Sequence, residues 1–133
     1  MKKVFKNLGI GHCNIEGGLS SNLGKTIEIN DVIFRENIDI FGINETNLKS
    51  TVDTDTLNLP QNYEFIRCDR PVSSGRGGCG VLINKNLKYR KFPINIKYTN
   101  VTKVEAIWIE LTEKIYFFAF SIDQTNILLR TYF

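Results

Sequence analysis

The chain has 133 residues, of which 42% are hydrophobic and 23% are charged, and this composition is typical of one soluble globular domain. Its formal net charge of +3 is mildly basic, which is compatible with a polyanionic partner but does not identify one. No apolar run reaches the roughly 18 residues of a transmembrane helix, and no long apolar segment follows the basic start, as a signal peptide requires. We therefore expect an intracellular protein without a membrane partner.

Three cysteines and a single histidine restrict the thiol and metal chemistry of this chain. The number of cysteines is odd, and the three residues are widely spaced: Cys13, Cys68 and Cys79. They lack the close pairs of a zinc-binding motif, and we expect them to be reduced thiols. His12 precedes Cys13 in a predicted strand, where neighbouring side chains point to opposite faces. This arrangement argues against a cysteine nucleophile that the histidine activates.

The first part of the chain predicts two strands joined by a helix. Residues 8–14 are expected to form a strand, and the segment after them has the glycine and serine content of a turn. Residues 25–36 show the apolar spacing of an amphipathic helix. The nearly unbroken apolar run that starts at Ile38 predicts a strand buried on both faces, which ends at Glu45. This order of elements indicates a parallel pair in an α/β fold.

The second part of the chain predicts further strands. A polar loop with one helical turn is expected at residues 46–62. Strands are predicted at residues 63–68, 79–84, 103–111 and 115–120, and the last two are expected to form a hairpin across a tight turn. Residues 121–133 show no strand or helix pattern and end on bulky apolar side chains.

Asn14 and Glu45 are candidates for a functional site because each ends a predicted strand. The two strands are parallel neighbours in the predicted fold, so both residues are expected at the same end of the sheet. Carboxylate oxygen is a ligand that Mg²⁺ prefers, and this ion often takes one or two protein carboxylates beside water and substrate phosphate. The Asn14 amide would orient a phosphate or a nucleophile next to it. The alternative is that Glu45 is only a solvated residue at a strand end.

A basic stretch at residues 84–104 is a second candidate, because it contains six basic residues and no acidic one. Its candidate nucleic-acid contacts are Lys85, Lys88, Arg90 and Lys91, and aromatic residues lie between and after them. Lysine and arginine neutralise phosphates, and aromatic rings stack on bases. Lysines also protect the exposed edge strand of a sheet, and the sequence leaves both interpretations open.

The glycine-rich segment at residues 75–80 is expected to form a hairpin or bulge whose glycines adopt positive φ. A nucleotide-binding loop is the alternative. The segment lacks the lysine and hydroxyl residue of a phosphate-binding P-loop, and it precedes a strand instead of a helix.

Taken in order, these motifs resemble the endonuclease/exonuclease/phosphatase superfamily, and within it the endonuclease domain of non-LTR retrotransposons. The matching segments are His-Cys-Asn-Ile at 12–15, Gly-Leu at 18–19, the apolar run with Glu-Thr at 37–46, Arg-Cys-Asp-Arg at 67–70 and the glycine-rich segment at 75–83. The resemblance implies part of a four-layer α/β sandwich of the deoxyribonuclease I type. It also implies that the family's reaction is Mg²⁺-assisted hydrolysis of a DNA phosphodiester bond by water.

The resemblance also implies roles for single residues. Asn14 would bind the phosphate and the catalytic groups, and Glu45 would be a ligand of Mg²⁺. Arg70 and Arg76 are candidate contacts to phosphate. DNA would be the partner, and in a full-length element a reverse transcriptase domain would use the nick to start insertion.

The sequence departs from the family pattern after residue 120. The family places a tyrosine where Phe120 and Ser121 stand, and its later Asp-x-Asn and Asp-His pairs have no counterpart. We therefore expect a partial domain at residues 1–120, truncated after its first half, and a non-matching tail at residues 121–133. The expected function is that of a fragment of a DNA-nicking endonuclease, inactive as an isolated chain and located inside the cell, in the nucleus in one interpretation. The alternatives are a non-catalytic remnant, a weak nucleic-acid-binding module, or a phosphatase of the same superfamily.

Overall fold

The computed structural model is a mixed α/β structure, which confirms the predicted class, and it describes residues 8–15, 17–20, 23–69, 77–91, 104–111, 114–121 and 128–132. The chain forms two compact units, residues 1–87 and 88–133, each with one four-stranded sheet. The boundary between these units differs from the domain boundary predicted at residue 120. The predicted boundary rests on the family resemblance and stays a prediction. In the described part, no helix has the length and hydropathy needed to span a membrane.

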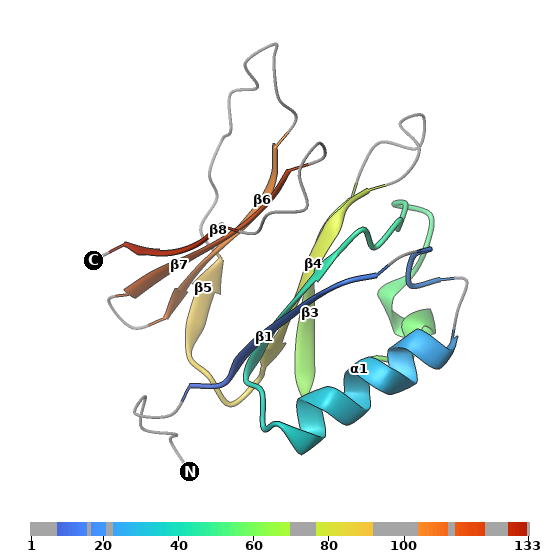
Figure 1. Ribbon diagram of the computed structural model, residues 1–133, viewed down its shortest axis with the longest axis horizontal. Helices are drawn as coiled ribbons and strands as arrows, with labels where there is room; N and C mark the ends of the chain where they lie inside the picture. The colour runs from blue at the N-terminus through green and yellow to red at the C-terminus, as the bar shows by residue number, and fades with distance from the viewer. Residues whose placement is uncertain are drawn as a thin grey trace. The chain divides into compact units, whose positions relative to one another are not determined.

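The first unit is a four-stranded sheet with one helix against it (Figure 1). Its strands are β1 (Ile10–Asn14), β2 (Ile40–Asn44), β3 (Tyr63–Cys68) and β4 (Cys79–Asn84), in the spatial order β1-β2-β4-β3. β1 and β2 are parallel and are joined through helix α1 (Leu23–Arg35), which confirms the predicted crossover. β4 is antiparallel to both neighbours, and the short 3-10 helix η2 (Thr54–Leu57) lies in the loop before β3.

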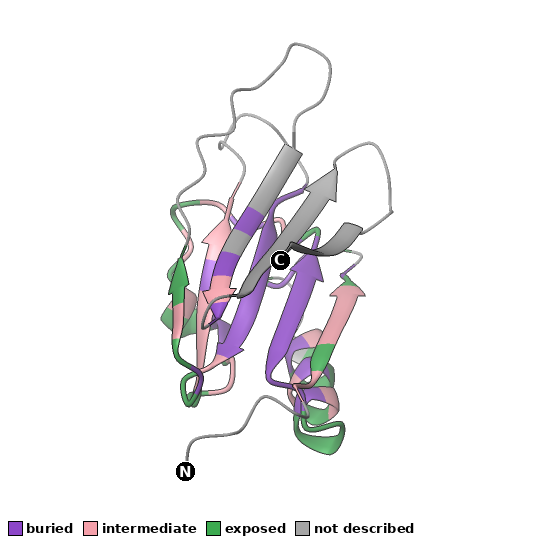
Figure 2. Ribbon diagram, turned by 90° about the vertical axis from the view of Figure 1, so that its left-hand side faces the viewer, coloured by how far each residue is buried: buried purple, intermediate pink, exposed green. Residues whose placement is uncertain are grey.

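The core of the first unit lies between α1 and one face of the sheet. Ile29 and Ile33 of the helix belong to the same buried cluster as Phe41 and Ile43 of β2. Burying a side chain of this size contributes about 2 kcal/mol. Because side chains alternate along a strand, Asn44 points to the opposite face. β2 and β4 are the buried central strands, whereas β1 and β3 are partly exposed (Figure 2).

A buried carboxylate fixes the end of the sheet at which β1 and β2 begin. The backbone N of Gly9 donates to Asp39 Oδ2 at 2.9 Å, and the backbone N of Asp39 donates to Gly9 O at 2.8 Å. The Tyr63 hydroxyl donates to Ile38 O at 2.5 Å, which joins the start of β3 to the same end. Burial, and then the nearby Asp39, raise the pKa of Tyr63. These contacts hold the register of the first two strands.

The second unit is an antiparallel sheet. Its strands are β5 (Tyr89–Lys91), β6 (Val104–Leu111), β7 (Lys114–Ser121) and β8 (Leu128–Tyr132), in the order β5-β6-β7-β8. β6 and β7 form the predicted hairpin, in which Leu111 pairs with Lys114. β5 is an edge strand that pairs with β6. β8 pairs with β7 and lies within residues 121–133, for which the sequence pattern predicts no element.

Candidate functional site

Three strands of the first sheet end on the same side. β1 and β2 are parallel, and both β2 and β3 are antiparallel to β4, so β1, β2 and β3 share one direction. Asn14, the last residue of β1, lies opposite Asn44, the last residue of β2, and Glu45 follows directly. The structure thus brings Asn14 and Glu45 to one end of the sheet, while their roles stay predictions. We call Asn14, Asn44 and Glu45 the strand-end site.

The loop after β1 holds the backbone around Glu45 from one side. Ile15 N donates to Asn44 O, and Leu19 N donates to Thr46 O, both at 3.0 Å. The side chains of Ile15, Leu19 and Thr46 are buried, so these bonds lie in a packed environment. The two carbonyl groups that flank Glu45 are therefore fixed by the segment that begins at Asn14.

The glycine-rich segment holds the same backbone from the other side. Thr46 N donates to Gly78 O at 3.3 Å, and Asn47 N donates to Gly77 O at 2.7 Å. Gly77 N donates in turn to Asn47 Oδ1 at 2.7 Å. Gly77 and Gly78 both have positive φ, as expected, whereas Gly80 belongs to β4 and residues 75 and 76 lie outside the described residues. A Cβ at Gly78 would lie 2.9 Å from Thr46 Oγ1, so close packing as well as backbone conformation favours glycine there.

Glu45 itself occupies a strained backbone conformation. Its φ is 54°, in the left-handed region, and its side chain is exposed. A residue with a Cβ pays on the order of 1 kcal/mol for this conformation. Asn47 has φ 51°, but asparagine tolerates the region better. Such strain persists only where the surroundings determine the backbone, and it concentrates at functional sites.

Asn44 is a residue of this site that the sequence analysis does not single out. Its side chain is only 7% exposed and lies on the face opposite to α1. It interacts there with the side chain of His12, which lies on the same face of β1. The available signal was a polar residue at the end of an apolar run, directly before Glu45.

His12 and Cys13 lie on opposite faces of β1, and neither forms an activated nucleophile. Burial lowers the pKa of His12, and a hydrogen bond with the Asn44 side chain partly opposes this shift. Cys13 packs against the core cluster beside α1. Burial raises the pKa of the Cys13 thiol to about 11, with a smaller opposing effect of Lys25. A thiol that stays protonated at neutral pH is a poor nucleophile, in agreement with the sequence argument.

The strand-end site offers oxygen ligands, which suit Mg²⁺ better than a thiolate-binding metal. Glu45 supplies an exposed carboxylate, and Asn14 and Asn44 supply amide oxygens at the same end of the sheet. Within the described ranges, no three His, Cys, Asp or Glu side chains gather as a metal-binding cluster. A site with one carboxylate fits an ion that keeps several waters and takes further oxygens from a phosphate.

Lys85, the predicted basic contact that the structure describes in the first unit, is not part of the strand-end site. Lys85 follows β4 and lies at the opposite end of the sheet, where its Nζ donates to Gln61 O at 2.8 Å. Arg70 and Arg76 lie outside the described residues.

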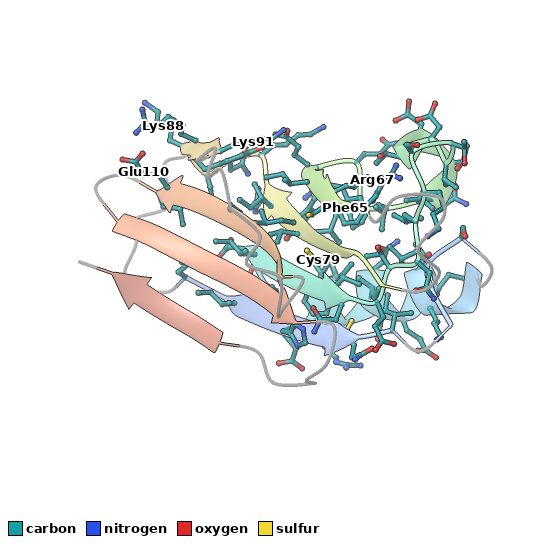
Figure 3. The ribbon with its side chains drawn as sticks, turned by 90° about the horizontal axis from the view of Figure 1, so that it is seen from above. Phe65, Arg67, Cys79, Lys88, Lys91 and Glu110 are labelled. Atoms are coloured by element: carbon teal, nitrogen blue, oxygen red, sulfur yellow. The ribbon has the colours of Figure 1, made fainter. Side chains whose placement is uncertain are left out.

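The other predicted basic residues belong to the second unit. Arg90 of β5 pairs with Glu110 of β6, with Nε donating to Oε2 at 2.8 Å. Lys88 and Lys91 are exposed beside this pair (Figure 3). Their position on and next to an edge strand agrees with the edge-protecting interpretation and also leaves them accessible to a phosphate.

Arg67 connects the loop after Glu45 to β3, a role that its place in the Arg-Cys-Asp-Arg motif does not reveal. Its guanidinium donates to Lys49 O at 2.9 Å and to Val52 O at 2.6 Å. It also donates to Asp69 Oδ2 at 2.6 Å, in a mostly buried ion pair (Figure 3). Two loop carbonyls are thus satisfied by one side chain, which makes Arg67 a structural support of the site.

Comparison with models of known protein families gave no match to this chain, and a search of curated proteins also found no significant match.

Proposed function

We propose that the strand-end site is the cation- and phosphate-binding part of a Mg²⁺-dependent DNA endonuclease of the endonuclease/exonuclease/phosphatase type. The observation that carries the proposal is Glu45, an exposed carboxylate on a strained backbone. It lies at the same end of the sheet as Asn14 and is held by two segments distant in sequence. A merely solvated strand end has no need of such a fixed and costly conformation. The order of the sequence motifs provides the reaction class.

In this proposal the chain's own residues bind and orient the substrate. The Glu45 carboxylate binds the cation, and the Asn14 amide donates a hydrogen bond to a phosphate oxygen. When bound, Mg²⁺ would neutralise the charge on the phosphate and on the leaving oxygen. The fixed backbone keeps both side chains in place before DNA arrives, so little reorganisation is needed on binding.

The finer parts of the proposal rest on the same resemblance. The two units would belong to a four-layer sandwich of the deoxyribonuclease I type, with residues 121–133 outside the family pattern. The 133 residues contain no counterpart of the family's later Asp-x-Asn and Asp-His pairs. We therefore expect the isolated chain to bind the cation without cleaving DNA. A reverse transcriptase domain and a nuclear location would belong to the full-length element.

Cation binding is the direct test. Mn²⁺, which can replace Mg²⁺ in oxygen sites and is visible by electron paramagnetic resonance, would be titrated into the wild type, Glu45→Gln and Glu28→Gln. Glu28 is the matched control, since it is an exposed carboxylate on α1. We expect Glu45→Gln to weaken Mn²⁺ binding at least tenfold, by loss of the one carboxylate, and Glu28→Gln to leave it unchanged. Equal affinities in all three proteins would overturn the proposal.

Plasmid nicking is the second measurement. Supercoiled DNA incubated with the chain in Mg²⁺ should stay intact, because binding alone does not supply the remaining catalytic groups. Nicking that is lost in Glu45→Ala would instead show that these 133 residues form an active nuclease.

One alternative function has an observation in its favour. Lys88 and Lys91 are exposed at the edge of the second sheet, and they would give weak nucleic-acid binding independent of Glu45. A phosphatase of the same superfamily would share the strand-end site and differ in its substrate. A nuclease and a phosphatase would both bind Mn²⁺, so Mn²⁺ binding does not distinguish them. An experiment in which duplex DNA and inositol phosphates compete for the protein would separate the two functions.

A further inference from the structure

Two cysteines face each other at one end of the first sheet. Cys68 is the last residue of β3 and Cys79 is the first residue of β4, and the two lie directly opposite in the antiparallel register. Side chains of opposite residues point to the same face of a sheet and interact there. Both cysteines are thiols in this structure. The fold therefore brings together a dithiol that no close pair in the sequence indicates.

The spacing of opposite strand residues suits a disulfide bond that can form and break. In an antiparallel pair the Cα atoms are about 4.5–5.5 Å apart, within the roughly 4.4–6.8 Å that a disulfide bridges. The Cβ atoms are about 4.5–5.5 Å apart, against about 3.5–4.5 Å in a disulfide. Closing this gap draws the two strands together. A bond formed under such strain is reduced more easily than a structural disulfide.

The two thiols differ in their accessibility. Cys79 is fully buried, whereas Cys68 is partly exposed. A small oxidant in solution therefore reaches Cys68 first, and Cys79 is placed to resolve the product. Cys13 does not compete for this role, because it packs on the α1 face of the sheet and burial raises its pKa to about 11.

The cysteine pair adjoins the backbone that supports Glu45. Cys79 directly follows Gly78, whose carbonyl accepts a hydrogen bond from Thr46 N, and Gly77 O accepts one from Asn47 N. These bonds open only if the two glycines move away from the segment after Glu45. A covalent bond from Cys79 to β3 opposes that movement.

We propose that Cys68 and Cys79 are a redox-sensitive pair, which a small-molecule disulfide such as glutathione disulfide converts reversibly into an intramolecular disulfide. The Cys68 thiolate attacks one sulfur of the reagent and releases a glutathione thiolate. The Cys79 thiolate then attacks the Cys68 sulfur and releases the second. The protein gives up two protons and two electrons, which the reagent takes up as two thiols. The new bond fixes the backbone at Glu45, and this inference does not depend on cation binding there.

The first experiment identifies the bond. Glutathione disulfide is added to the wild type, Cys68→Ser and Cys13→Ser, and the products are measured by mass spectrometry. The wild type and Cys13→Ser should lose two hydrogen atoms, and trypsin should release peptide 68–76 joined to peptide 77–85. Dithiothreitol should reverse the change, and Cys68→Ser should form no intramolecular disulfide. A glutathione adduct that persists on Cys68 of the wild type, or a bond to Cys13, contradicts the proposal.

A relocated thiol tests whether the strand register is responsible. Ile66 lies two residues before Cys68 on the same face of β3, but it pairs with Val81 and not with Cys79. Ile66→Cys combined with Cys68→Ser should therefore form no disulfide in the folded protein, and should form one in urea. Equally fast cross-linking of the relocated and native pairs in the folded state would show that closeness in sequence suffices.

Hydrogen exchange tests the connection to Glu45. Oxidation of the wild type should slow exchange of the Thr46 and Asn47 amides at least about fivefold, because the local opening that exposes them is restricted. The amides of α1 are the control and should change less. Unchanged exchange at Thr46 and Asn47, or equal slowing throughout α1, would show that the disulfide does not act on the Glu45 backbone.

Discussion

Glu45 combines an exposed charged side chain with a left-handed backbone, which is uncommon for residues other than glycine. The exposure means that no packing of the side chain compensates for the strain. The compensation comes instead from neighbours, because Asn44, Thr46 and Asn47 are all held by backbone hydrogen bonds. The conformation is therefore imposed on Glu45, and its energetic cost can be measured by substitution.

The strain at Glu45 predicts an inverted preference between glycine and alanine. Both substitutions remove the carboxylate, so their difference reports the backbone alone. We expect Glu45→Gly to be more stable than Glu45→Ala by about 1 kcal/mol, because only glycine adopts positive φ without cost. Free energies of unfolding in urea measure this difference.

The matched control is the same pair of substitutions at Glu28 on α1. In a helix the order reverses, and Glu28→Ala should be more stable than Glu28→Gly by about 1 kcal/mol. If alanine is also preferred at position 45, the left-handed conformation of Glu45 is wrong.

Cys13 predicts a loss of stability at high pH. Its pKa is about 11 in the folded protein, against an ordinary value of 9.0 in the unfolded chain. Between these values the unfolded chain releases a proton that the folded protein retains. Stability from this group is therefore complete below pH 9 and falls as the pH rises towards 11. Urea unfolding from pH 8 to 10.5 should show a steeper decline for the wild type than for Cys13→Ala, and parallel curves would show that burial does not perturb the thiol.

At the scale of elements, Arg67 predicts a localised loss of structure. Arg67→Leu leaves Asp69 without this charge partner and removes the Arg67 donor to Val52 O. Lys49 O loses one of two donors, since the backbone N of Val52 still donates to it. We expect a cost of about 3 kcal/mol, as for a broken buried ion pair. Hydrogen exchange should quicken first in residues 49–57, the loop that Arg67 holds.

Arg35 provides the control for Arg67, since its two ion pairs lie on the surface. Its partners Asp31 and Glu36, like Arg35, are more than half exposed. Arg35→Leu should change stability by no more than about 0.5 kcal/mol. A similar loss in both variants would mean that the burial of the Arg67 pair adds nothing.

The elements of the first unit were largely predictable because their sequence signals are local. The apolar run from Ile38 gives a buried strand, and the helix begins and ends within two residues of its predicted limits. β8 was not predicted as a strand, and β5 only in the edge-strand interpretation of the basic stretch, since their formation depends on pairing with β7 and β6. Arg67 lies on the same face of β3 as Tyr63 and Phe65, which pack against the core. This spacing predicts a structural role for Arg67, which its place in the Arg-Cys-Asp-Arg motif does not indicate.

At the scale of the whole molecule, exposed lysines predict salt-dependent binding to nucleic acid. Lys88 and Lys91 are exposed near the edge of the second sheet. Replacing both by glutamine should reduce the slope of log affinity against log salt by about 1.4 for single-stranded DNA, roughly 0.7 for each lost phosphate contact. Fluorescence anisotropy at several salt concentrations measures the slope.

A control for that experiment is Arg35→Gln, which removes one exposed positive charge from the first unit. Its slope should equal that of the wild type. A reduced slope in this control as well would mean that overall charge, and not the lysine pair, determines binding.

Much of the candidate site could be predicted, and the remainder depends on tertiary structure. A parallel pair of strands places Asn14 and Glu45 together, and this follows from the order of elements alone. The same topology places Lys85 at the far end of the sheet, which a count of basic residues cannot reveal. The interaction between the side chains of His12 and Asn44 is visible only once β1 and β2 are paired.

The two-sided support of Glu45 has a consequence for synthesis on the ribosome. Glu45 leaves the ribosome well before Gly77 and Gly78, the residues that fix Thr46 and Asn47. A nascent chain that lacks them has a relaxed backbone at Glu45, because contacts distant in sequence form late. The proposed cation binding should therefore begin only when β4 has been made and paired. The site would then form in a single step, near the end of synthesis of the first unit.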